Sequence, residues 1–233
     1  LDVNEGTKVT VADMVVEGNT VFSDDDLQGA MSVKPEGFLW WRDGSYERER
    51  LDQDLQVNIP NFYTGQGYLD FRVLGDSLVI APTTGKTRLE ITVDEGSAYR
   101  LADFSISGNS EFSTEELRRL FRPERSGLFS DDEMDGDDLP IFNAAQFEAS
   151  TALVSQRYQN EGYLYSQILP FVERNPVEEG QPPTVNVGWN IQEGTQAYVA
   201  RVDIEGNEFT YERVIRDKIF VLPGDVYSQD RII

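Results

Sequence analysis

Two kinds of hydrophobic pattern run along the chain. Residues 104–107 and 184–192 alternate apolar with polar side chains, which is typical of β-strands with one buried and one solvated face. Between residues 51 and 63, apolar side chains instead recur every four positions, which predicts a helix with one apolar stripe. The sequence therefore predicts a mixture of short strands and helices.

Short signatures return with these patterns. A strand ending in Gly-Asn, followed closely by an aromatic and a hydroxyl residue, occurs three times in the chain. The three copies are Gly18-Asn19 with Phe22-Ser23, Gly108-Asn109 with Phe112-Ser113, and Gly206-Asn207 with Phe209-Thr210. The glycines are 90 and 98 residues apart, so the chain consists of repeats of that length.

Two further signatures recur in the same order. Tyr-x3-Gly-Tyr occurs at residues 63–68 and again at 158–163, where the glycine is suited to end a helix. An alternating strand that closes in Glu-Gly occurs at residues 5–6, 95–96 and 193–194. Three signatures in one fixed order indicate a repeated structural module.

Each repeat predicts the element order β-α-α-β-β. Ser23, Ser113 and Thr210 are expected to cap the first helix of their repeats. In the second helix of the first repeat, Pro60 is expected to kink or restart the helix. Two helices on one face of a three-stranded mixed sheet would bury both apolar stripes, so the predicted fold class is α+β.

Two strands are expected to close each repeat. In the first repeat they span residues 68–74 and 87–94, and in the second repeat 163–172 and 184–192. The final strands alternate apolar with polar residues, so the sheet is expected to have one apolar face and one solvent-exposed face.

Composition excludes most enzyme chemistry. The chain of 233 residues contains no cysteine and no histidine, which removes thiol nucleophiles, imidazole bases and Cys/His metal cages. Its net charge of −22 argues against binding to nucleic acid or to an anionic bilayer. No enzyme activity, no cofactor and no metal are therefore predicted, and no apolar run reaches the 18 residues of a membrane helix.

At this point the signatures resemble those of POTRA domains, the polypeptide-transport-associated modules that precede the barrel in outer-membrane assembly proteins of the BamA type. Residues 7–97 and 98–195 resemble two complete copies. Residues 1–6 resemble the end of a preceding copy, and residues 196–233 the N-terminal part of a further copy, similar to the one nearest the barrel. The complete copies would then be the third and fourth of five.

The resemblance implies a non-enzymatic scaffold at the periplasmic face of the outer membrane of a Gram-negative bacterium. It implies that the module guides unfolded outer-membrane β-barrel proteins, docks accessory assembly lipoproteins, and continues into a membrane β-barrel. Two alternatives stay open: the POTRA region of a two-partner-secretion transporter, and a divisome scaffold protein with a POTRA-like domain. An enzyme would require a cleft of carboxylates that nothing in the sequence predicts.

The strand after each Gly-Tyr is expected to lie at a sheet edge, where it could bind an extended polypeptide by β-augmentation. The resemblance suggests this position, and Pro170 supports it independently because proline in sheets is found mainly at edges. The candidate partner-binding residues are Tyr68, Leu69, Asp70, Phe71, Arg72, Val73, Tyr163, Leu164, Tyr165, Ile168, Pro170 and Phe171. The plainer interpretation is that these edges are merely solvated and that their aromatic residues are packing residues.

Several glycines and asparagines are expected to form turns or hinges. They are Gly18, Asn19, Gly96, Gly108, Asn109, Gly194, Gly206 and Asn207. The short junctions at residues 96–101 and 194–200 are expected to set the angle between modules.

Three other features of the sequence give weaker signals. The acidic run Asp131–Asp138 resembles a calcium loop but has Phe142 where a bidentate glutamate is needed, so a solvated loop is favoured. Gly65-x-Gly67 lacks the third glycine of a nucleotide loop. Trp40-Trp41 is expected to pack against its own or a neighbouring module, or alternatively to touch a partner or the membrane interface.

The acidic excess predicts a dependence of stability on salt. Only four residues are lysines, and such a composition is typical of a protein from a salt-loving organism. The competing interpretation is that the acidity repels misdirected anionic lipid or serves basic partners. Because 1 M salt shortens the screening length to about 3 Å, we expect the thermal midpoint to rise between 0.15 M and 1 M NaCl. Differential scanning calorimetry measures the midpoint, and a midpoint that stays flat or falls contradicts adaptation to salt.

Overall fold

The computed structural model describes residues 10–35, 47–80, 86–121, 139–177, 179–228 and 230. The predicted end of a preceding module at residues 1–6, Trp40-Trp41 and the acidic run Asp131–Asp138 lie outside these residues. Contacts divide the chain into two compact units. The first unit contains residues up to 100 together with 139–145 and 176–184, and the second unit contains the remaining described residues from 101 onward.

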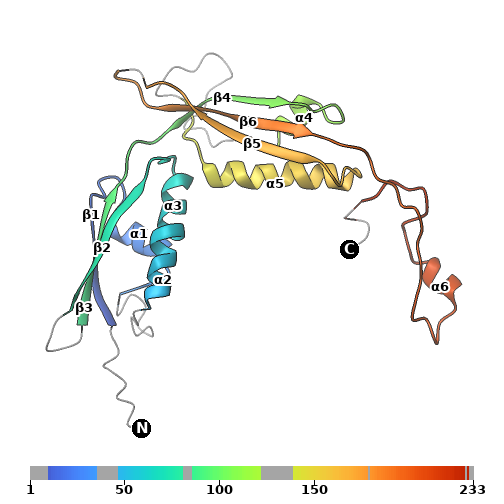
Figure 1. The fold of residues 1–233 in the computed structure, drawn as a ribbon, viewed down its shortest axis with the longest axis horizontal. Helices are drawn as coiled ribbons and strands as arrows, with labels where there is room; N and C mark the ends of the chain where they lie inside the picture. Colours follow the sequence, from blue (N-terminus) through green and yellow to red (C-terminus); the bar gives the residue numbers. More distant parts are fainter. Residues whose placement is uncertain are drawn as a thin grey trace, which may run out of the picture. The chain divides into compact units, whose positions relative to one another are not determined.

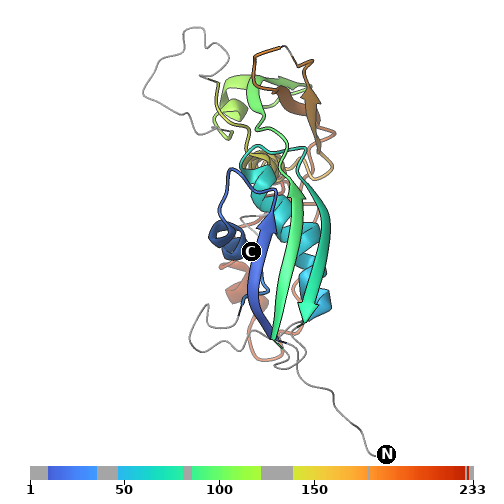
Figure 2. The same ribbon diagram turned by 90° about the vertical axis from the view of Figure 1, so that its left-hand side faces the viewer.

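The first unit is built on a three-stranded mixed sheet. Its strands are β1 (Thr10–Glu17), β2 (Arg72–Ile80) and β3 (Lys86–Asp94), in the spatial order β1-β3-β2. The central strand β3 runs parallel to β1 and antiparallel to β2. Figure 2 shows β3 between its two neighbours, so β1 and β2 are the edges of this sheet.

Helices cover one face of this sheet (Figure 1). They are α1 (Asp24–Ala30), α2 (Arg48–Gln53) and α3 (Ile59–Gly65), with a π-helical turn, η1 (Asp54–Asn58), between the last two. The predicted stripe of Leu51, Leu55, Ile59 and Tyr63 is buried against Leu89, Ile91 and Val93 of β3 in a single core. The predicted order β-α-α-β-β and the α+β class are confirmed.

Pro60 lies in the first turn of α3, which begins at Ile59 directly after η1, so an α-helical segment restarts there as predicted. The helical path continues through Pro60 because the preceding turn widens to π geometry, in which the Ile59 amide donates to the Asp54 carbonyl. A π turn holds one more residue than an α turn. Leu51 and Tyr63 are twelve positions apart, whereas the corresponding Phe147 and Tyr158 of the second unit are eleven apart, and the π turn takes up this extra residue.

The second unit repeats the plan. Its strands β4 (Arg100–Ser107), β5 (Gln167–Arg174) and β6 (Thr184–Gln192) lie in the order β4-β6-β5. Its helices are α4 (Thr114–Arg118) and α5 (Ala144–Asn160), and α5 lies along one face of the sheet (Figure 1). Trp189 of β6 is fully buried, stacks on Phe147 with ring centroids 5.9 Å apart, and donates its indole N–H to Thr151.

The first helices of both units begin at the predicted caps. Ser23 accepts from the Asp26 amide, Ser113 accepts from the Glu116 amide, and in each case the acidic side chain bonds back to the cap. These reciprocal bonds satisfy amides that have no partner within the helix.

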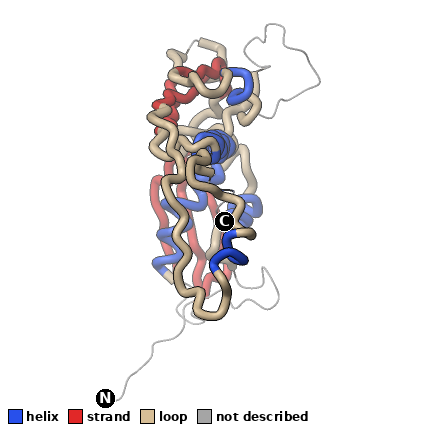
Figure 3. Tube along the Cα trace, turned by 90° about the vertical axis from the view of Figure 1, so that its right-hand side faces the viewer, coloured by secondary structure: helices blue, strands red, loops and turns tan. Residues whose placement is uncertain are grey.

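The third repeat departs from its prediction. Its helix α6 (Glu212–Arg216) begins after Tyr211, not Thr210, and Tyr211 makes no side-chain capping bond. Asn207 bonds the Thr210 carbonyl as Asn19 bonds that of Phe22, so Thr210 occupies the aromatic position and the predicted register was wrong by one residue. The strand expected at Val202 and Ile204 does not form: residues 199–207 contain no strand, and Figure 3 shows the segment before α6 as loop. No described strand pairs with these residues, and a strand without a partner is not stable.

After the Glu-Gly of each unit, one residue is held by two main-chain hydrogen bonds. In the first unit the Tyr99 amide donates to the Gly67 carbonyl at 2.9 Å, and the Tyr99 carbonyl accepts from the Phe142 amide at 3.0 Å. The second unit repeats these two bonds at 2.8 and 3.0 Å with Ala197, Gly162 and Tyr227. The residue five positions after each final strand is therefore held by hydrogen bonds on both its amide and its carbonyl.

Gly188 in the centre of β6 provides a test of how closely the second sheet is packed. A Cβ atom there would lie 2.0 Å from the Ser105 carbonyl oxygen and 2.7 Å from the ring of Phe171, its cross-strand partner. We expect Gly188→Ala to lower the free energy of unfolding by about 1–3 kcal/mol, because the neighbouring backbone must move. Urea denaturation measures the change.

Gly75→Ala in β2 is the matched control. A Cβ atom at Gly75 would meet nothing within 4 Å, so this substitution should be neutral or gain about 0.5–1 kcal/mol by restricting the unfolded chain. Equal losses in the two variants would show that Gly188 is not under steric constraint.

Candidate functional site

One buried carboxylate joins the three sequence signatures of the first unit. Glu95, in the Glu-Gly that follows β3, is only 5% exposed. It accepts from the Thr20 amide and hydroxyl, both at 2.7 Å, and from the Val21 amide at 3.1 Å, in the loop after Gly18-Asn19. It also accepts from the hydroxyl of Tyr63 at 2.9 Å. We call Glu95 and these three donor residues the first carboxylate node.

The second unit has the same arrangement. Glu193 accepts from the Ser110 amide at 2.6 Å and the Glu111 amide at 2.8 Å, again in the loop after Gly-Asn. It also accepts from the hydroxyl of Tyr158 at 2.8 Å. This second carboxylate node shows that the three signatures recur together because they are partners of one glutamate.

Hydrogen bonding keeps both glutamates ionised. Burial alone would raise the pKa of Glu95, but the bonds from Thr20, Tyr63 and Val21 outweigh it and hold the pKa below the ordinary 4.5. The pKa of Glu193 is lowered in the same way, against the effect of burial, by its amide and hydroxyl donors. Burial, reinforced by the adjacent glutamate, raises the pKa values of Tyr63 and Tyr158.

Glycine is required beside each node. Gly18 and Gly108 have φ angles of 95° and 80°, in the left-handed region that favours glycine. A Cβ atom on either would lie 2.1 Å from a carbonyl oxygen of the final strand, at Val93 or Ile191. The loop amides can therefore reach the carboxylate only if the first strand ends in glycine.

The first node also positions the start of edge strand β2. Tyr63 stacks on Phe71, with ring centroids 3.9 Å apart and planes 11° apart, and Phe71 immediately precedes β2. In the second unit Tyr158 contacts Tyr163 at 5.9 Å, and Tyr163 donates to Glu111 at 2.7 Å, which raises the pKa of Tyr163 to about 12. Tyr-x3-Gly-Tyr thus fixes where the chain turns from helix into edge strand.

The structure places the edges as predicted but shifts the strands. Both β2 and β5 lie at a sheet edge. The expected strand start at Tyr68 was wrong, because Gly67 and the bond from the Tyr68 amide to the Tyr63 carbonyl turn the chain before β2 begins at Arg72. The expected start at Tyr163 was wrong for the same reason, and β5 begins at Gln167.

The twelve predicted edge residues therefore separate into two groups. Five lie in the edge strands: Arg72, Val73, Ile168, Pro170 and Phe171. Seven lie in the preceding turns: Tyr68, Leu69, Asp70, Phe71, Tyr163, Leu164 and Tyr165. Residues 75–80 of β2 were missed, although the β-branched pair Val79-Ile80 was a usable signal.

Two hollows lie beside the β2 edge. A pocket of about 470 Å³ is lined by residues 69–72 with Asp94 and Gly96. A groove of about 560 Å³ runs between β2 and the helical segment η1, and its lining includes Leu55, Pro60 and Leu74. At one end of the groove Arg48 pairs with Asp76 of β2 at 2.7 Å. An extended chain beside β2 would place alternate side chains over this groove.

The predicted turn residues lie in the loops before the first helix of each repeat, and the predicted hinge residues lie in the segments after the final strands. Asn19, Asn109 and Asn207 each donate to the carbonyl three residues ahead, which closes the loop after the first strand. Gly96, Gly194 and Gly206 have positive φ angles.

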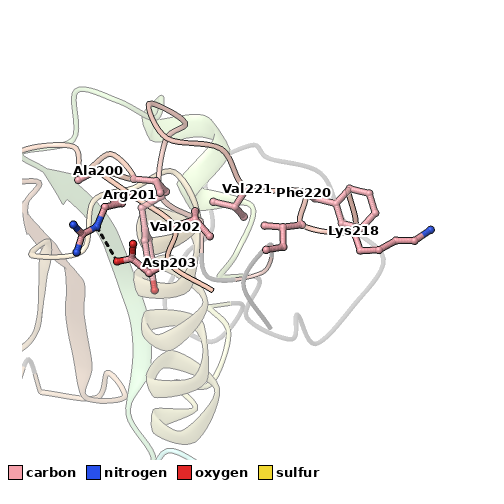
Figure 4. A pocket seen from close by; sticks show the side chains of 10 residues that line it. Ala200, Arg201, Val202, Asp203, Lys218, Phe220 and Val221 are labelled. Atoms are coloured by element: carbon pink, nitrogen blue, oxygen red, sulfur yellow. Dashed lines mark ion pairs between the residues drawn. The ribbon is translucent and has the colours of Figure 1, made fainter. Parts of the chain in front are cut away.

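A larger pocket of about 1060 Å³ lies in the third repeat (Figure 4). Residues 199–203 line one side and residues 218–221 another, with Arg201 and Asp203 paired at 2.8 Å. In Figure 4, Lys218 and Phe220 project away from Ala200 to Asp203. The pocket brings together no set of reactive side chains.

The described residues contain no group of three or more acidic side chains that could hold a metal ion. In the same part of the chain, every helix is too short or too polar to cross a bilayer. The candidate site consists of the edge strands β2 and β5 and the two carboxylate nodes.

This arrangement defines a class of protein: tandem α+β modules that present an edge strand. A family model described as "POTRA: Surface antigen variable number repeat" matches residues 9–96 and 99–194, and the chain belongs to the POTRA family.

Curated relatives match the whole chain. It is 26% identical to the "Outer membrane protein assembly factor BamA" of Neisseria meningitidis serogroup B, over 100% of this chain and 27% of that protein. It is 27% identical to the "Putative outer membrane protein assembly factor" of Treponema pallidum, over 98% of this chain and 25% of that protein. The chain thus spans about a quarter of the length of these relatives.

Solved structures show the same fold. The crystal structure of Haemophilus influenzae BamA POTRA3-5 has a TM-score of 0.62 and 19% identity, covering 96% of this chain and 82% of that one. BamA from Haemophilus ducreyi lacking POTRA domains 1-3 has a TM-score of 0.53 and 12% identity, covering 80% of this chain and 29% of that one.

The node predicts a loss of stability in acid. Since the pKa of Glu95 is lowered in the folded state, its contribution is fully present above the unfolded value of about 4.5 and is lost as pH falls through the folded value. We expect Glu95→Gln to destabilise the chain at pH 7 by about 1–3 kcal/mol, because buried amides lose a charged acceptor. The variant should also lose less stability than the natural chain between pH 5 and pH 3, measured by urea denaturation.

Glu17→Gln is the control for charge removal, since Glu17 is an exposed glutamate at the end of β1. It should change stability by less than about 0.5 kcal/mol. If Glu95→Gln were equally mild and kept the same acid dependence, the carboxylate would not organise the fold.

Proposed function

We propose that the chain is a periplasmic scaffold segment of an outer-membrane β-barrel assembly machine, acting by binding and not by catalysis. The named function of the two assembly-factor relatives supports this assignment. The absence of cysteine and histidine from the sequence also favours a binding role. We propose unfolded outer-membrane β-barrel proteins as clients and accessory assembly lipoproteins as docking partners.

The observation that carries the binding mode is the open edge. An edge strand has backbone N–H and C=O groups on one side that no neighbouring strand uses. β2 is an edge of its sheet, and the groove between β2 and η1 lies beside it. Because backbone groups are common to all sequences, strand addition there would accept many different unfolded chains.

The chemistry of the groove suggests which strands fit. Leu55, Pro60 and Leu74 offer apolar surface, while the opposite face of β3 carries Arg88, Glu90 and Thr92 toward solvent. An added strand that alternates apolar with polar residues would direct its apolar side to the groove and its polar side to water. Such alternation is the pattern of transmembrane barrel strands.

We also propose residues 7–97 and 98–195 as the two complete modules and the short junctions as their pivots. The positive φ angles of Gly96 and Gly194, in the junctions at residues 96–101 and 194–200, support this proposal.

Hydrogen–deuterium exchange tests the binding mode. The probe is a synthetic peptide of about ten alternating valine and threonine residues, the length of one barrel strand. We expect amides of residues 75–80 to exchange more slowly at saturating peptide, because they gain main-chain hydrogen bonds.

The same peptide with N-methyl groups on alternate amides is the control, since methylation removes the donors of one edge and leaves the side chains. Binding that survives methylation would exclude strand addition, and protection confined to residues outside β2 and β5 would exclude it at these two edges.

A further inference from the structure

The two predicted edges differ in their main-chain donors. β5 pairs with β6 in an unbroken antiparallel register from Gln167 to Arg174, with Pro170 opposite Trp189. In an antiparallel pair, alternate residues direct their N–H and C=O groups toward the partner or away from it. An unbroken ladder therefore places Pro170 among the residues whose backbone groups face away from β6, since proline has no N–H to donate.

This position interrupts the free side of β5. Ile168 and Val172 have the same parity, so their outward N–H groups lie on either side of a gap at the centre of the strand. A strand added there would lose one hydrogen bond and would meet the proline ring where it needs a donor.

β2 has no such interruption. It contains no proline between Arg72 and Ile80. Its one irregularity is a bulge between Val73 and Gly75, at the start of the strand, after which pairing with β3 continues regularly to Ile80. Residues 75–80 thus form a continuous open edge.

The side chains of β5 explain why its edge needs to be blocked against pairing with other chains; we call a residue that blocks an edge in this way a guard. The run Ile168–Val172 is apolar throughout, and Leu169, Phe171 and Val172 are 45%, 36% and 45% exposed. An exposed apolar edge strand pairs readily with other chains, and natural proteins block such edges with proline or charge.

We propose that Pro170 closes the β5 edge to strand addition, so that, of the two edges β2 and β5, only β2 pairs with an extended polypeptide. The proposal rests on the function proposed above but concerns a different element. It makes consecutive modules unequal: the first offers backbone pairing, and the second offers only the apolar side chains of β5.

The test removes the guard. Pro170→Val keeps a β-compatible apolar side chain and restores one outward N–H. With the valine–threonine peptide, the natural chain should bind one peptide and protect residues 75–80 only. Pro170→Val should bind two, and the amides of Ile168 and Val172 should exchange about tenfold more slowly than in the natural chain.

A further outcome is that Pro170→Val self-associates at a concentration where the natural chain is monomeric. If the same amides are then protected, the result also supports the proposal, because the added strand is β5 of a second copy. Pro176→Val is the matched control. Pro176 is exposed and lies after the end of β5, so its replacement should leave stoichiometry and exchange unchanged.

The outcomes separate the two proposals. Equal protection of β2 and β5 in the natural chain would overturn the guard and leave strand addition intact. Protection of β5 in Pro170→Val without protection of β2 in either protein would support the guard and overturn the proposed site at β2. A Pro170→Val chain that has the natural thermal midpoint but gains no protection at Ile168 and Val172 would overturn the guard.

Discussion

The fold of each unit depends on the hydrogen bonds that surround one glutamate, which is buried in the first unit and half-buried in the second. Glu95 and Glu193 each connect the loop after the first strand, the end of the second helix and the end of the final strand. A buried charge is costly unless it is fully hydrogen-bonded, so the carboxylate forces all three segments to meet. In the first unit, Tyr63 of the node stacks on Phe71 in the turn before β2, which links the node to the edge proposed to bind clients.

Much of this architecture is readable in the sequence because the nodes require particular residues. Gly18 and Gly108 have no space for a Cβ atom, and Asn19 and Asn109 close the loops that follow. Because of these constraints, the same residue types recur at the same spacing in both units. The alternation of apolar and polar residues predicts the strands between them, and the helical periodicity predicts the helices. The node itself was not predicted: the Glu-Gly signature was recognised, but only coordinates show that its glutamate faces inward.

The errors have physical causes as well. Residues 68–71 have the side chains of a strand, yet the left-handed Gly67 and the hydrogen bonds after it form a turn, so tertiary context overrides propensity. The π turn before Pro60 was not predicted, because the sequence does not show whether a helix restarts at a proline after a kink or after a π turn. In the third repeat, Phe209-Thr210 imitates Phe22-Ser23 one residue too early, and only the bond from Asn207 fixes the register.

The central claim is that Glu95 and Tyr63 act as a unit, and a double-mutant cycle tests it most directly. Free energies of unfolding would be measured for the natural chain, Glu95→Gln, Tyr63→Phe and the double variant. Groups in direct contact within one network typically couple by about 0.5–3 kcal/mol, and a coupling energy in that range is predicted. Additive effects within about 0.3 kcal/mol, the behaviour of independent sites, would contradict the account.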